Sequence, residues 1–271
     1  MTVKVFSEAL GNYVEVPRPL NSIVSLDPAA TEAIFMMGAG RLVKATDAFS
    51  YRPPEAKLVP KIGSYTHVDE DELRRHDPDI IFTSTGVQRE LSNKLLKSGF
   101  NVYPVPVATS VGKILDNVII IGEIIDKKKE ARSLYLNMLS KINPLIGTIK
   151  QATRVYVELD LGGPITPGFP THISDAINIL GGINVFDDVD EAYFEPKAYQ
   201  ILERRPDLII YEPKRGAKVD EAAVIERLKA RGINIATSKI RITKGDFLAH
   251  MGPTFITEAM YWMQQAISSA N

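Results

Sequence analysis

Short apolar runs and amphipathic stretches alternate along most of the chain, a pattern typical of strands that alternate with helices. Residues 23–26 (IVSL) read as a buried strand, and residues 28–37 (PAATEAIFMM) read as the helix that follows it and ends at Gly-Ala-Gly. Asp27 is placed to cap this helix with its carboxylate, and Pro28 suits the first helical position, where its missing N–H costs nothing. The loop between strand and helix lies at the carboxyl end of the strand, where open α/β sheets bind ligands.

The two halves of the chain contain similar segments in the same order. In the first pair a helix stops at glycine before a strand. In the second a helix ends before proline and an aspartate leads a β-branched strand, and in the third an amphipathic helix ends at glycine before another strand. The pairs are MMGAGRLVKA (36–45) with ILGGINVFDD (179–188), RRHDPDIIFT (74–83) with ERRPDLIIYE (203–212), and LLKSGFNVYPV (95–105) with RLKARGINIAT (227–237). Three pairs in register predict two similar α/β lobes.

A long amphipathic stretch separates the two halves. In residues 126–150 apolar side chains recur at helical spacing, and the first glycine is Gly147. The stretch predicts a connecting helix between an N-terminal lobe, 1–125, and a C-terminal lobe, 151–271. A rigid connector of this kind allows only modest lobe motion, whereas the alternative is an ordinary helix packed on one lobe. Residues 253–270 predict a second amphipathic helix.

Composition narrows the classes of function. The 271 residues carry a formal net charge of −1, which gives no argument for nucleic acid or an anionic membrane as a partner. The absence of cysteine excludes disulfide scaffolds, thiolate metal sites and cysteine nucleophiles. The N-terminus has no basic-then-apolar leader, and no run is long enough to span a bilayer. Either the protein is intracellular, or its leader is not part of this sequence.

Motifs of catalysis are missing from the sequence. It contains no dinucleotide-binding or phosphate-binding glycine motif, no nucleophile elbow and no H-E-x-x-H. The glycine-rich stretch LDLGGPITPG (159–168) carries prolines and reads as a structural turn. Two α/β lobes with a cleft could still form an enzyme, but no pair of carboxylates and no base–nucleophile pair stands at a recognisable spacing. No catalytic residue is therefore predicted.

Three of the four histidines fall in predicted loops. These are His67, His172 and His250, and together with an acidic residue at one cleft they could form a metal site. Each one alone reads as a surface or hydrogen-bonded histidine, and His76, near a helix end, as a favourable charge there. A binding protein for a bare metal ion is the second hypothesis, and no metal ligand is assigned.

Aromatic and cationic residues gather in the loops at the predicted strand ends. Aromatic faces with a few fixed polar groups are what a mid-sized organic ligand needs, and Arg and Lys pair with its anionic groups. The alternative is that aromatics such as Tyr51, Tyr65 and Tyr193 only pack their own loops. The loops are FSYR (49–52), GSYTH (63–67), STG (84–86), GFPTH (168–172), AYFEP (192–196), YEPKRG (211–216), KIR (239–241) and AHMGP (249–253).

The acidic stretch VDEDEL (68–73) begins a predicted helix. Asp69 can cap this helix, and Glu72 stands three residues later as in a capping box. Acidic side chains also favour a helix N-terminus, so the stretch has a structural explanation without any function.

Taken together, these segments resemble the helical-backbone (class III) substrate-binding proteins of ABC importers, which take up vitamin B12, ferric siderophores and haem. The resemblance rests on SEALGNYVEVPRPLNSIVSLDPAATEAIFMMGAG, YRPPEAKLVPKIGSYTHVDEDELRRHDPDIIF, ISDAINILGGINVFDDV and AYQILERRPDLII, and covers nearly the whole chain. It implies two Rossmann-like α/β lobes joined by one long helix, a ligand in the cleft between them, and no catalysis or cofactor. The Asp27 loop would face that cleft.

The resemblance also implies partners and a location. A permease and its ATPase would receive the ligand from a monomeric, extracytoplasmic protein, and an acidic residue on each lobe would dock onto the permease. In the first lobe this residue is Asp71, with Glu72 beside it. The position counted back equally from Pro206 is Tyr199, so Glu195 is the nearest substitute in the second lobe.

The implied ligand is a metal chelate, either a ferric siderophore or a cobalamin, with haem or a bare metal ion as alternatives. The cations would suit an anionic siderophore, and the aromatic side chains would suit the faces of a corrin. The iron of haem would need a Tyr or His ligand, which Tyr65, His67 or His172 could provide. The predicted ligand-binding residues are Asp27, Tyr51, Arg52, Tyr65, Phe169, Tyr193, Phe194, Lys214, Arg215 and Arg241.

Overall fold

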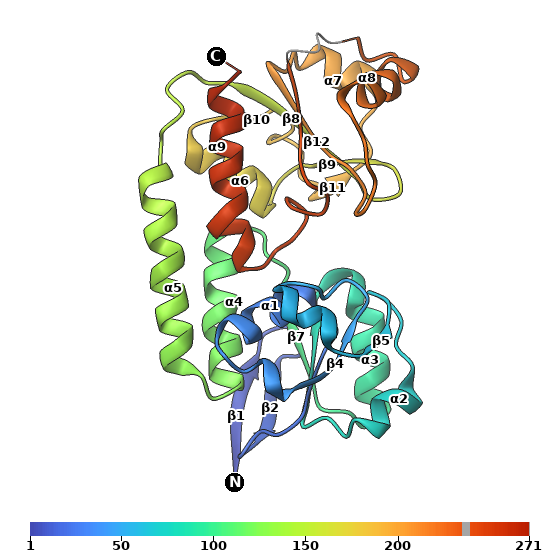
Figure 1. The fold of residues 1–271 in the computed structure, drawn as a ribbon, viewed down its shortest axis with the longest axis vertical. Coiled ribbons are helices and arrows are strands. Elements are labelled where there is room, and N and C mark those ends of the chain that lie inside the picture. Colours follow the sequence, from blue (N-terminus) through green and yellow to red (C-terminus); the bar gives the residue numbers. More distant parts are fainter. Residues whose placement is uncertain (235–238, 271) are drawn as a thin grey trace. The chain divides into compact units, whose positions relative to one another are not determined.

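The computed structural model describes residues 1–234 and 239–270, which fold into two α/β units (Figure 1). Unit 1 comprises Met1–Val107 and Gly112–Met138, and unit 2 comprises Ala108–Val111 and Leu139–Asn271. Each unit has its own sheet with helices packed against it. The α/β class predicted from the sequence is therefore confirmed.

The sheet of unit 1 is parallel throughout. Its strand order is β5-β4-β3-β6-β7, and every neighbouring pair runs in the same direction. An antiparallel hairpin of two further strands precedes it, and the sequence analysis did not predict this hairpin. The strands are β1 (Thr2–Ser7), β2 (Asn12–Pro17), β3 (Ile23–Ser25), β4 (Val43–Asp47), β5 (Lys61–Gly63), β6 (Ile80–Ser84) and β7 (Val102–Val105).

Five α-helices of the described chain lie wholly or mostly in unit 1. They are α1 (Pro28–Met36), α2 (Glu70–Arg75), α3 (Arg89–Lys97), α4 (Val111–Ile124) and α5 (Lys128–Ile142). Leu73 of α2 and Leu91 and Leu95 of α3 pack with strand residues in one apolar core. The helix α5 occupies the centre of the predicted connector; it is 15 residues long and a 3-10 turn, Asn143–Leu145, follows it. Its residues belong to unit 1 as far as Met138 and to unit 2 beyond it.

The sheet of unit 2 is mixed. Its order is β11-β9-β8-β12-β13, with β10 also paired to β8. The pairs β8–β9 and β9–β11 are antiparallel, and the pairs β8–β10, β8–β12 and β12–β13 are parallel. The strands are β8 (Arg154–Asp160), β9 (Pro164–Pro167), β10 (Ile183–Asn184), β11 (Tyr193–Phe194), β12 (Leu208–Glu212) and β13 (Ile240–Ile242). The stretch 159–168 was predicted as a structural turn, but only residues 161–163 form the turn between strands, because the stretch also contains the end of β8 and the whole of β9.

The helices of unit 2 lie on both sides of this sheet, with α6 and α9 on one side and α7 and α8 on the other (Figure 1). Ile201 of α7 and Val224 and Leu228 of α8 pack on strand residues in a second apolar core. The bounds are α6 (His172–Leu180), α7 (Ala198–Glu203), α8 (Glu221–Ala230), a π-helical segment (Phe255–Ala259) and α9 (Met260–Ser268). The predicted C-terminal helix is thus confirmed, and its apolar side, from Phe255 to Ile267, is buried.

The predicted duplication is visible in the strand pairings. In unit 1, β3 is flanked by β4 and β6, and β7 follows β6; in unit 2, β8 is flanked by β10 and β12, and β13 follows β12. The third repeated segment predicts a strand at its end, but residues 235–237 of that segment lie outside the described residues. Of residues 239–241, predicted as a loop, residues 240 and 241 instead belong to β13, because Ile240–Ile242 pair in register with Ile209–Tyr211 of β12.

The second repeated segment has the same local geometry in both units. A residue with positive φ precedes the proline, Asp77 (φ 42°) in unit 1 and Arg205 (φ 48°) in unit 2. The aspartate after the proline then accepts from the backbone where the neighbouring strand begins. Asp79 Oδ2 accepts from Asn21 N (2.7 Å) and Ser22 N (2.9 Å), and Asp207 Oδ2 accepts from Arg154 N (2.9 Å). Proline and aspartate therefore start the central strands of both sheets in the same way.

Candidate ligand-binding site

Several predicted ligand residues meet at the carboxyl ends of β3, β4, β5 and β6, which we call edge 1. Asp27 follows β3, Tyr51 and Arg52 follow β4, and Tyr65 follows β5. Because these parallel strands are neighbours, their carboxyl ends lie on one side of the sheet. Four residues from three separate loops are thus carried to one edge of unit 1.

Tyr65 is held firmly at edge 1. Its hydroxyl is hydrogen-bonded to Ser84 Oγ at 3.0 Å, and its ring meets Phe49 edge to face at 6.3 Å between centroids. Burial, followed by the charge of Asp27, raises the pKa of Tyr65 to about 12, so the phenol stays neutral. A fixed, neutral phenol offers a ligand an aromatic face and a hydroxyl.

The buried Gln88 joins the strands of edge 1, and sequence reasoning missed it. Its Nε2 donates to the carbonyls of Leu26 (2.7 Å) and Tyr65, and its Oε1 accepts from Ser84 N. One side chain therefore ties the loops after β3 and β5 to the end of β6. The position of Gln88 just after the Ser-Thr-Gly loop was the only feature of the sequence that could have indicated this role.

Tyr51 and Arg52 form a cation–aromatic pair at edge 1. The guanidinium lies 4.8 Å from the centroid of the Tyr51 ring, and Nη1 donates to the Tyr51 hydroxyl at 3.2 Å. Both side chains are half-buried. The pair presents a positive charge and an aromatic surface together, which suits an anionic ligand with flat faces.

Two carboxylates lie beneath edge 1. Asp27 is buried and caps α1 by accepting from Ala30 N at 2.8 Å, as the sequence predicts. Asp47, at the end of β4, is fully buried and accepts from Ser50 N (2.7 Å) and Phe49 N (3.2 Å). Sequence reasoning missed Asp47, although an aspartate that closes a buried strand was a signal.

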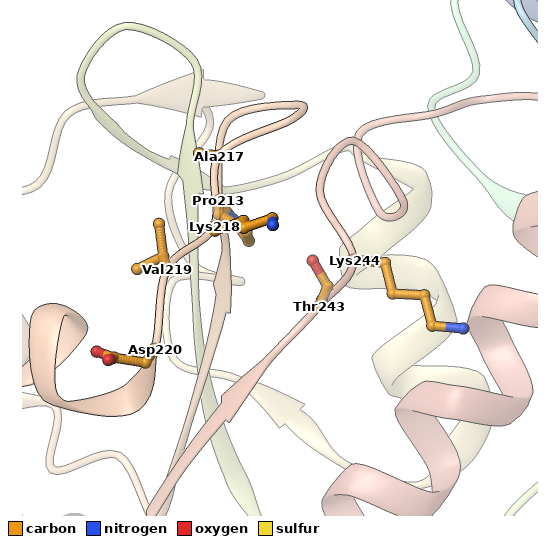
Figure 2. Close-up of a pocket in the computed structure, with 7 residues that line it drawn as sticks. All are labelled: Pro213, Ala217, Lys218, Val219, Asp220, Thr243 and Lys244. Carbon is orange, nitrogen blue, oxygen red and sulfur yellow. The ribbon is translucent and has the colours of Figure 1, made fainter.

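In unit 2, Lys214 and Arg215 lie in the loop after β12, and both are exposed. The loops after β12 and β13 form a surface pocket of about 430 Å³ (Figure 2). We call these two loops edge 2. The residues that line the pocket are Pro213, Ala217, Lys218, Val219, Asp220, Thr243 and Lys244. Edge 2 is therefore rich in exposed cations.

Glu212, the last residue of β12, fixes the second loop of edge 2. Its carboxylate accepts from Thr243 Oγ1 (2.9 Å) and from the backbone N–H groups of Phe247 (2.8 Å), Leu248 (2.6 Å) and Ala249 (2.9 Å). Burial raises the pKa of Glu212, while these hydrogen bonds oppose the rise. The loop that carries Lys244 is thus held in one shape by a buried carboxylate.

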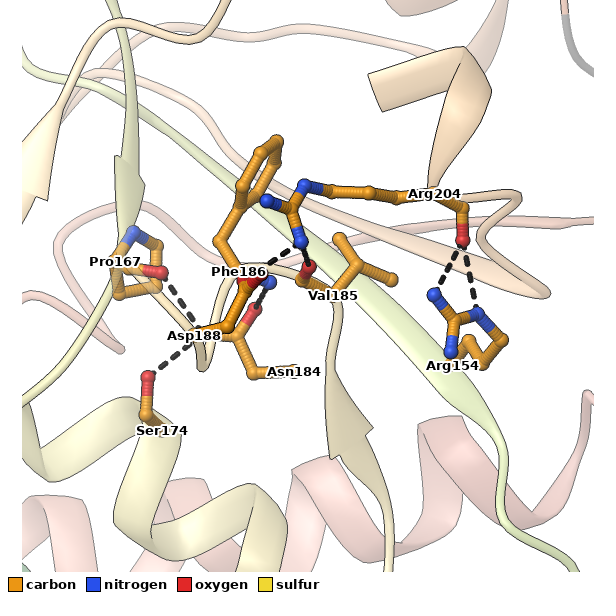
Figure 3. Close-up of polar contacts among 8 residues, drawn as sticks. All are labelled: Arg154, Pro167, Ser174, Asn184, Val185, Phe186, Asp188 and Arg204. Carbon is orange, nitrogen blue, oxygen red and sulfur yellow. Dashed lines mark hydrogen bonds and ion pairs between the residues drawn. The ribbon is translucent and has the colours of Figure 1, made fainter. Parts of the chain in front are cut away.

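A polar network supports the region around α6 in unit 2 (Figure 3). Asn184 Nδ2 donates to Pro167 O (2.8 Å) and Ser174 Oγ (2.7 Å). Arg204 donates to Val185 O and pairs with Asp188 at 2.6 Å, while Arg154 donates to Arg204 O. These contacts tie β9, α6 and the end of α7 into one scaffold.

The other predicted ligand residues of unit 2 lie in different surroundings. Tyr193 Oη is 3.5 Å from His172 Nδ1, and Phe194 packs on Phe186 of the core with 5.3 Å between centroids. Phe169 is 50% exposed. Arg241 lies in β13, not in a loop, and donates to Ser269 Oγ and O just after α9. The structure thus does not gather these residues at edge 2 with Lys214 and Arg215.

The predicted docking residues are at the surface. Asp69 caps α2 as predicted, Asp71 is exposed, and Glu72 pairs with Arg75. In unit 2, Tyr199 of α7 is 55% exposed, and Glu195 is exposed just before that helix. The structure places these side chains where a partner could reach them.

The histidines are separated between the units. His67 is exposed in unit 1, and His172 and His250 are buried in unit 2. His172 Nε2 is 2.8 Å from Leu248 O, and burial lowers the pKa of His172 to about 4. Within residues 1–234 and 239–270, no three His, Asp or Glu side chains form a group that could hold a metal ion. None of the described helices is long and apolar enough to cross a bilayer.

Comparison with known proteins assigns the chain to a family. A family model described as periplasmic binding protein matches residues 23–235. The chain belongs to the periplasmic binding protein family.

Individual relatives are distant. The vitamin B12-binding protein of Vibrio cholerae is 24% identical over 197 residues, which are 71% of each chain. A periplasmic haem-binding protein from Roseiflexus sp. has a TM-score of 0.78 at 19% identity, covering 93% of this chain and all of that one. A protein of an ABC-type Fe³⁺-hydroxamate transport system from Saccharomonospora viridis has a TM-score of 0.77 at 20% identity, covering 97% and 98%.

Proposed function

We propose that this chain is the extracytoplasmic substrate-binding component of an ABC importer, which captures a metal chelate and delivers it to a permease. One observation carries the proposal. Predicted ligand residues from separate loops meet at edge 1 of a parallel sheet, in a chain of the periplasmic binding protein family. The names of the three relatives, which concern vitamin B12, haem and a ferric hydroxamate, support a chelate as the ligand class.

The side chains of both edges favour an anionic chelate. Arg52 stacks on Tyr51 at edge 1, and Lys214 and Arg215 stand exposed at edge 2. The proposed ligand would use the aromatic faces of Tyr51 and Tyr65 for its organic part and the cations for its carboxylate, phosphate or catecholate groups. A ferric siderophore would use both the aromatic faces and the cations, whereas the corrin of cobalamin would use mainly the aromatic faces.

The proposal includes the absence of catalysis and a transport partner. The ligand would leave the protein chemically unchanged, and binding would shift populations of conformations without a reaction. Asp71 and Glu72 would dock onto the permease, whose ATPase drives transport, and the protein would act as a monomer. No residue is assigned a catalytic role or a resident cofactor.

Calorimetry with cyanocobalamin, haemin and a panel of ferric siderophores tests the proposal. We expect tight binding of one ligand, with the others weaker. No binding across the panel, together with tight binding of zinc or manganese ions, would favour a bare-metal binding protein. Recovery of the bound ligand after long incubation separates binding from catalysis, because an enzyme would return it altered.

A pair of variants tests the charge argument with the tightest chelate of that panel. Lys214→Gln with Arg215→Gln should weaken binding of an anionic chelate by about tenfold, or about 1.4 kcal/mol. The exposed Lys97 of α3 provides the matched control, because Lys97→Gln removes a cation far from both edges in sequence. Equal affinities for the two variants would contradict the assignment of edge 2.

A further inference from the structure

The carboxyl group of Asp47 is unusual among the described side chains of unit 1. It is fully buried, and its Oδ2 atom has no hydrogen-bond partner among the described residues. The other oxygen accepts from Ser50 N and Phe49 N. A buried carboxylate oxygen without a donor carries a large desolvation cost when the group is charged, and a proton on that oxygen removes the charge.

The charged groups around Asp47 do not offset this cost. Asp27, at the start of α1, adds a second negative charge to the same region. The helix α1 also carries the buried Glu32 and contacts β4. The ammonium group of Lys61 in β5 donates to Thr46 Oγ1 (2.7 Å), Ser50 O and Ala56 O (2.9 Å). The phenol of Tyr65 is neutral.

We propose that Asp47 is a pH-sensitive element of unit 1, which holds a proton in the folded chain and destabilises edge 1 when that proton is lost. The loop that carries Tyr51 begins beside this group, because Phe49 and Ser50 donate their N–H groups to it. The loop that carries Tyr65 also begins there, because Asp47 pairs with Gly63 at the end of β5. Edge 1 is therefore held more firmly in mild acid than at neutral pH. This role does not depend on the identity of any ligand.

The electrostatics agree with the geometry. Burial is the main cause that raises the pKa of Asp47 to about 6; the hydrogen bonds of Ser50 oppose the rise, and the charge of Asp27 adds to it. An unfolded aspartate has a pKa of about 4. Between about pH 4 and pH 6, Asp47 is therefore still protonated in the folded chain but already ionised in the unfolded chain. The free energy of unfolding of unit 1 then falls as the pH rises through this window.

The direct test is the ¹³C NMR signal of the Asp47 carboxyl in the full, ligand-free chain, assigned through its own backbone signals. We expect its titration midpoint near pH 6, and a downward shift of that midpoint in the Asp27→Asn variant. A midpoint at or below about pH 4 would overturn the proposal, as would a midpoint that Asp27→Asn leaves unchanged.

A stability measurement provides the second readout. Between pH 4 and pH 7 the ionisation of Asp47 should raise the unfolding equilibrium constant of unit 1 by about 100-fold relative to Asp47→Asn. Asp126→Asn is the matched control, because Asp126 is an exposed aspartate of unit 1 with a positive φ of 59° that asparagine tolerates. The proposal fails if Asp47→Asn follows the same pH profile as this control. Because no ligand is present, such a failure would leave the proposed transport function untouched.

Discussion

Units 1 and 2 share a scaffold but differ in the chemistry they carry. Both start their central strands from a Pro-Asp segment, and both order those strands in the same way. Edge 1, however, contains buried carboxylates and fixed aromatics, whereas edge 2 contains exposed lysines and Arg215. The strand β3 can be aligned with β8, because each pairs with the strand that follows a Pro-Asp segment, β6 in unit 1 and β12 in unit 2. In this alignment Leu26, just after β3, corresponds to Glu158 in β8. Duplication has preserved the hydrogen bonds that define the topology, and the side chains at the edges have diverged.

The largest effect is expected at this Leu26–Glu158 difference. Glu158 is buried, accepts from Tyr156 Oη, and pairs with Arg231 at 2.7 Å. Arg231→Met leaves the carboxylate buried without its cation, so urea unfolding should show a loss of about 3 kcal/mol. The triple variant Tyr156→Phe, Glu158→Leu, Arg231→Met imitates the apolar arrangement of unit 1 and should recover most of that loss. A triple variant no more stable than Arg231→Met would mean that the two positions are not equivalent.

The two units should respond to pH in opposite directions. Burial lowers the pKa of His172 to about 4, against about 6.5 in an unfolded chain. The neutral ring therefore stabilises unit 2 fully above about pH 6.5, and up to about 3 kcal/mol of that stability is lost as the pH falls toward 4. Asp47 has the opposite effect in unit 1, where stability falls as the pH rises toward 6.

The single tryptophan makes this prediction measurable. Trp262 lies in α9 of unit 2, so its fluorescence reports on that unit, while circular dichroism reports on both. Denaturation followed by fluorescence should show a midpoint that decreases from pH 7 to pH 4.5, and His172→Gln should flatten this dependence. A fluorescence midpoint that rises in acid would contradict the buried, neutral state of His172.

A smaller loss is expected from the shared aspartates. Asp79→Ala removes an acceptor for two backbone N–H groups, and Asp207→Ala removes an acceptor for one. Because hydrogen bonds to charged groups contribute about 1.5–3 kcal/mol, we expect losses of about 2 kcal/mol, larger for Asp79. The asparagine variants, which keep an acceptor oxygen, should lose less in a urea unfolding series. If alanine and asparagine cost the same, the carboxylate does not start the strands as described.

Much of this scaffold could be predicted from local chemistry. Some features depend only on neighbours in sequence and could be predicted from the pattern of residues. They are the caps Asp27 and Asp69, the Pro-Asp segments and the apolar side of the C-terminal helix. The β1–β2 hairpin was missed, although the alternating valines of both strands and Gly11 (φ 63°) in the turn between them are local signals. The antiparallel β9–β11 pair joins strands far apart in sequence and therefore leaves little local signal. Asp47 and Gln88 were missed for the same reason, since their importance comes from burial and from contacts with distant loops. Arg241 was predicted in a loop, because a strand of three residues is too short to show alternation.

The smallest effect concerns docking, where the units differ again. Asp71→Ala with Glu72→Ala should weaken association with the permease by about tenfold, or about 1.4 kcal/mol, and leave chelate affinity unchanged. Glu195→Ala in unit 2 should have a smaller effect, because α7 presents the exposed Tyr199 where α2 presents Asp71. Pull-down with membrane-embedded permease, paired with calorimetry, measures both quantities. A loss of chelate affinity in the double variant would show that α2 belongs to the ligand site.

Binding of a chelate at both edges can be measured by the backbone amide NMR shifts on titration with the tightest chelate of the panel, used as its gallium form if it is a siderophore. We expect one-to-one binding, with the largest shifts at residues 49–52 and 63–67 of edge 1 and 213–218 of edge 2. Shifts at one edge alone, or at neither edge, would contradict the assignment of both edges to the ligand site.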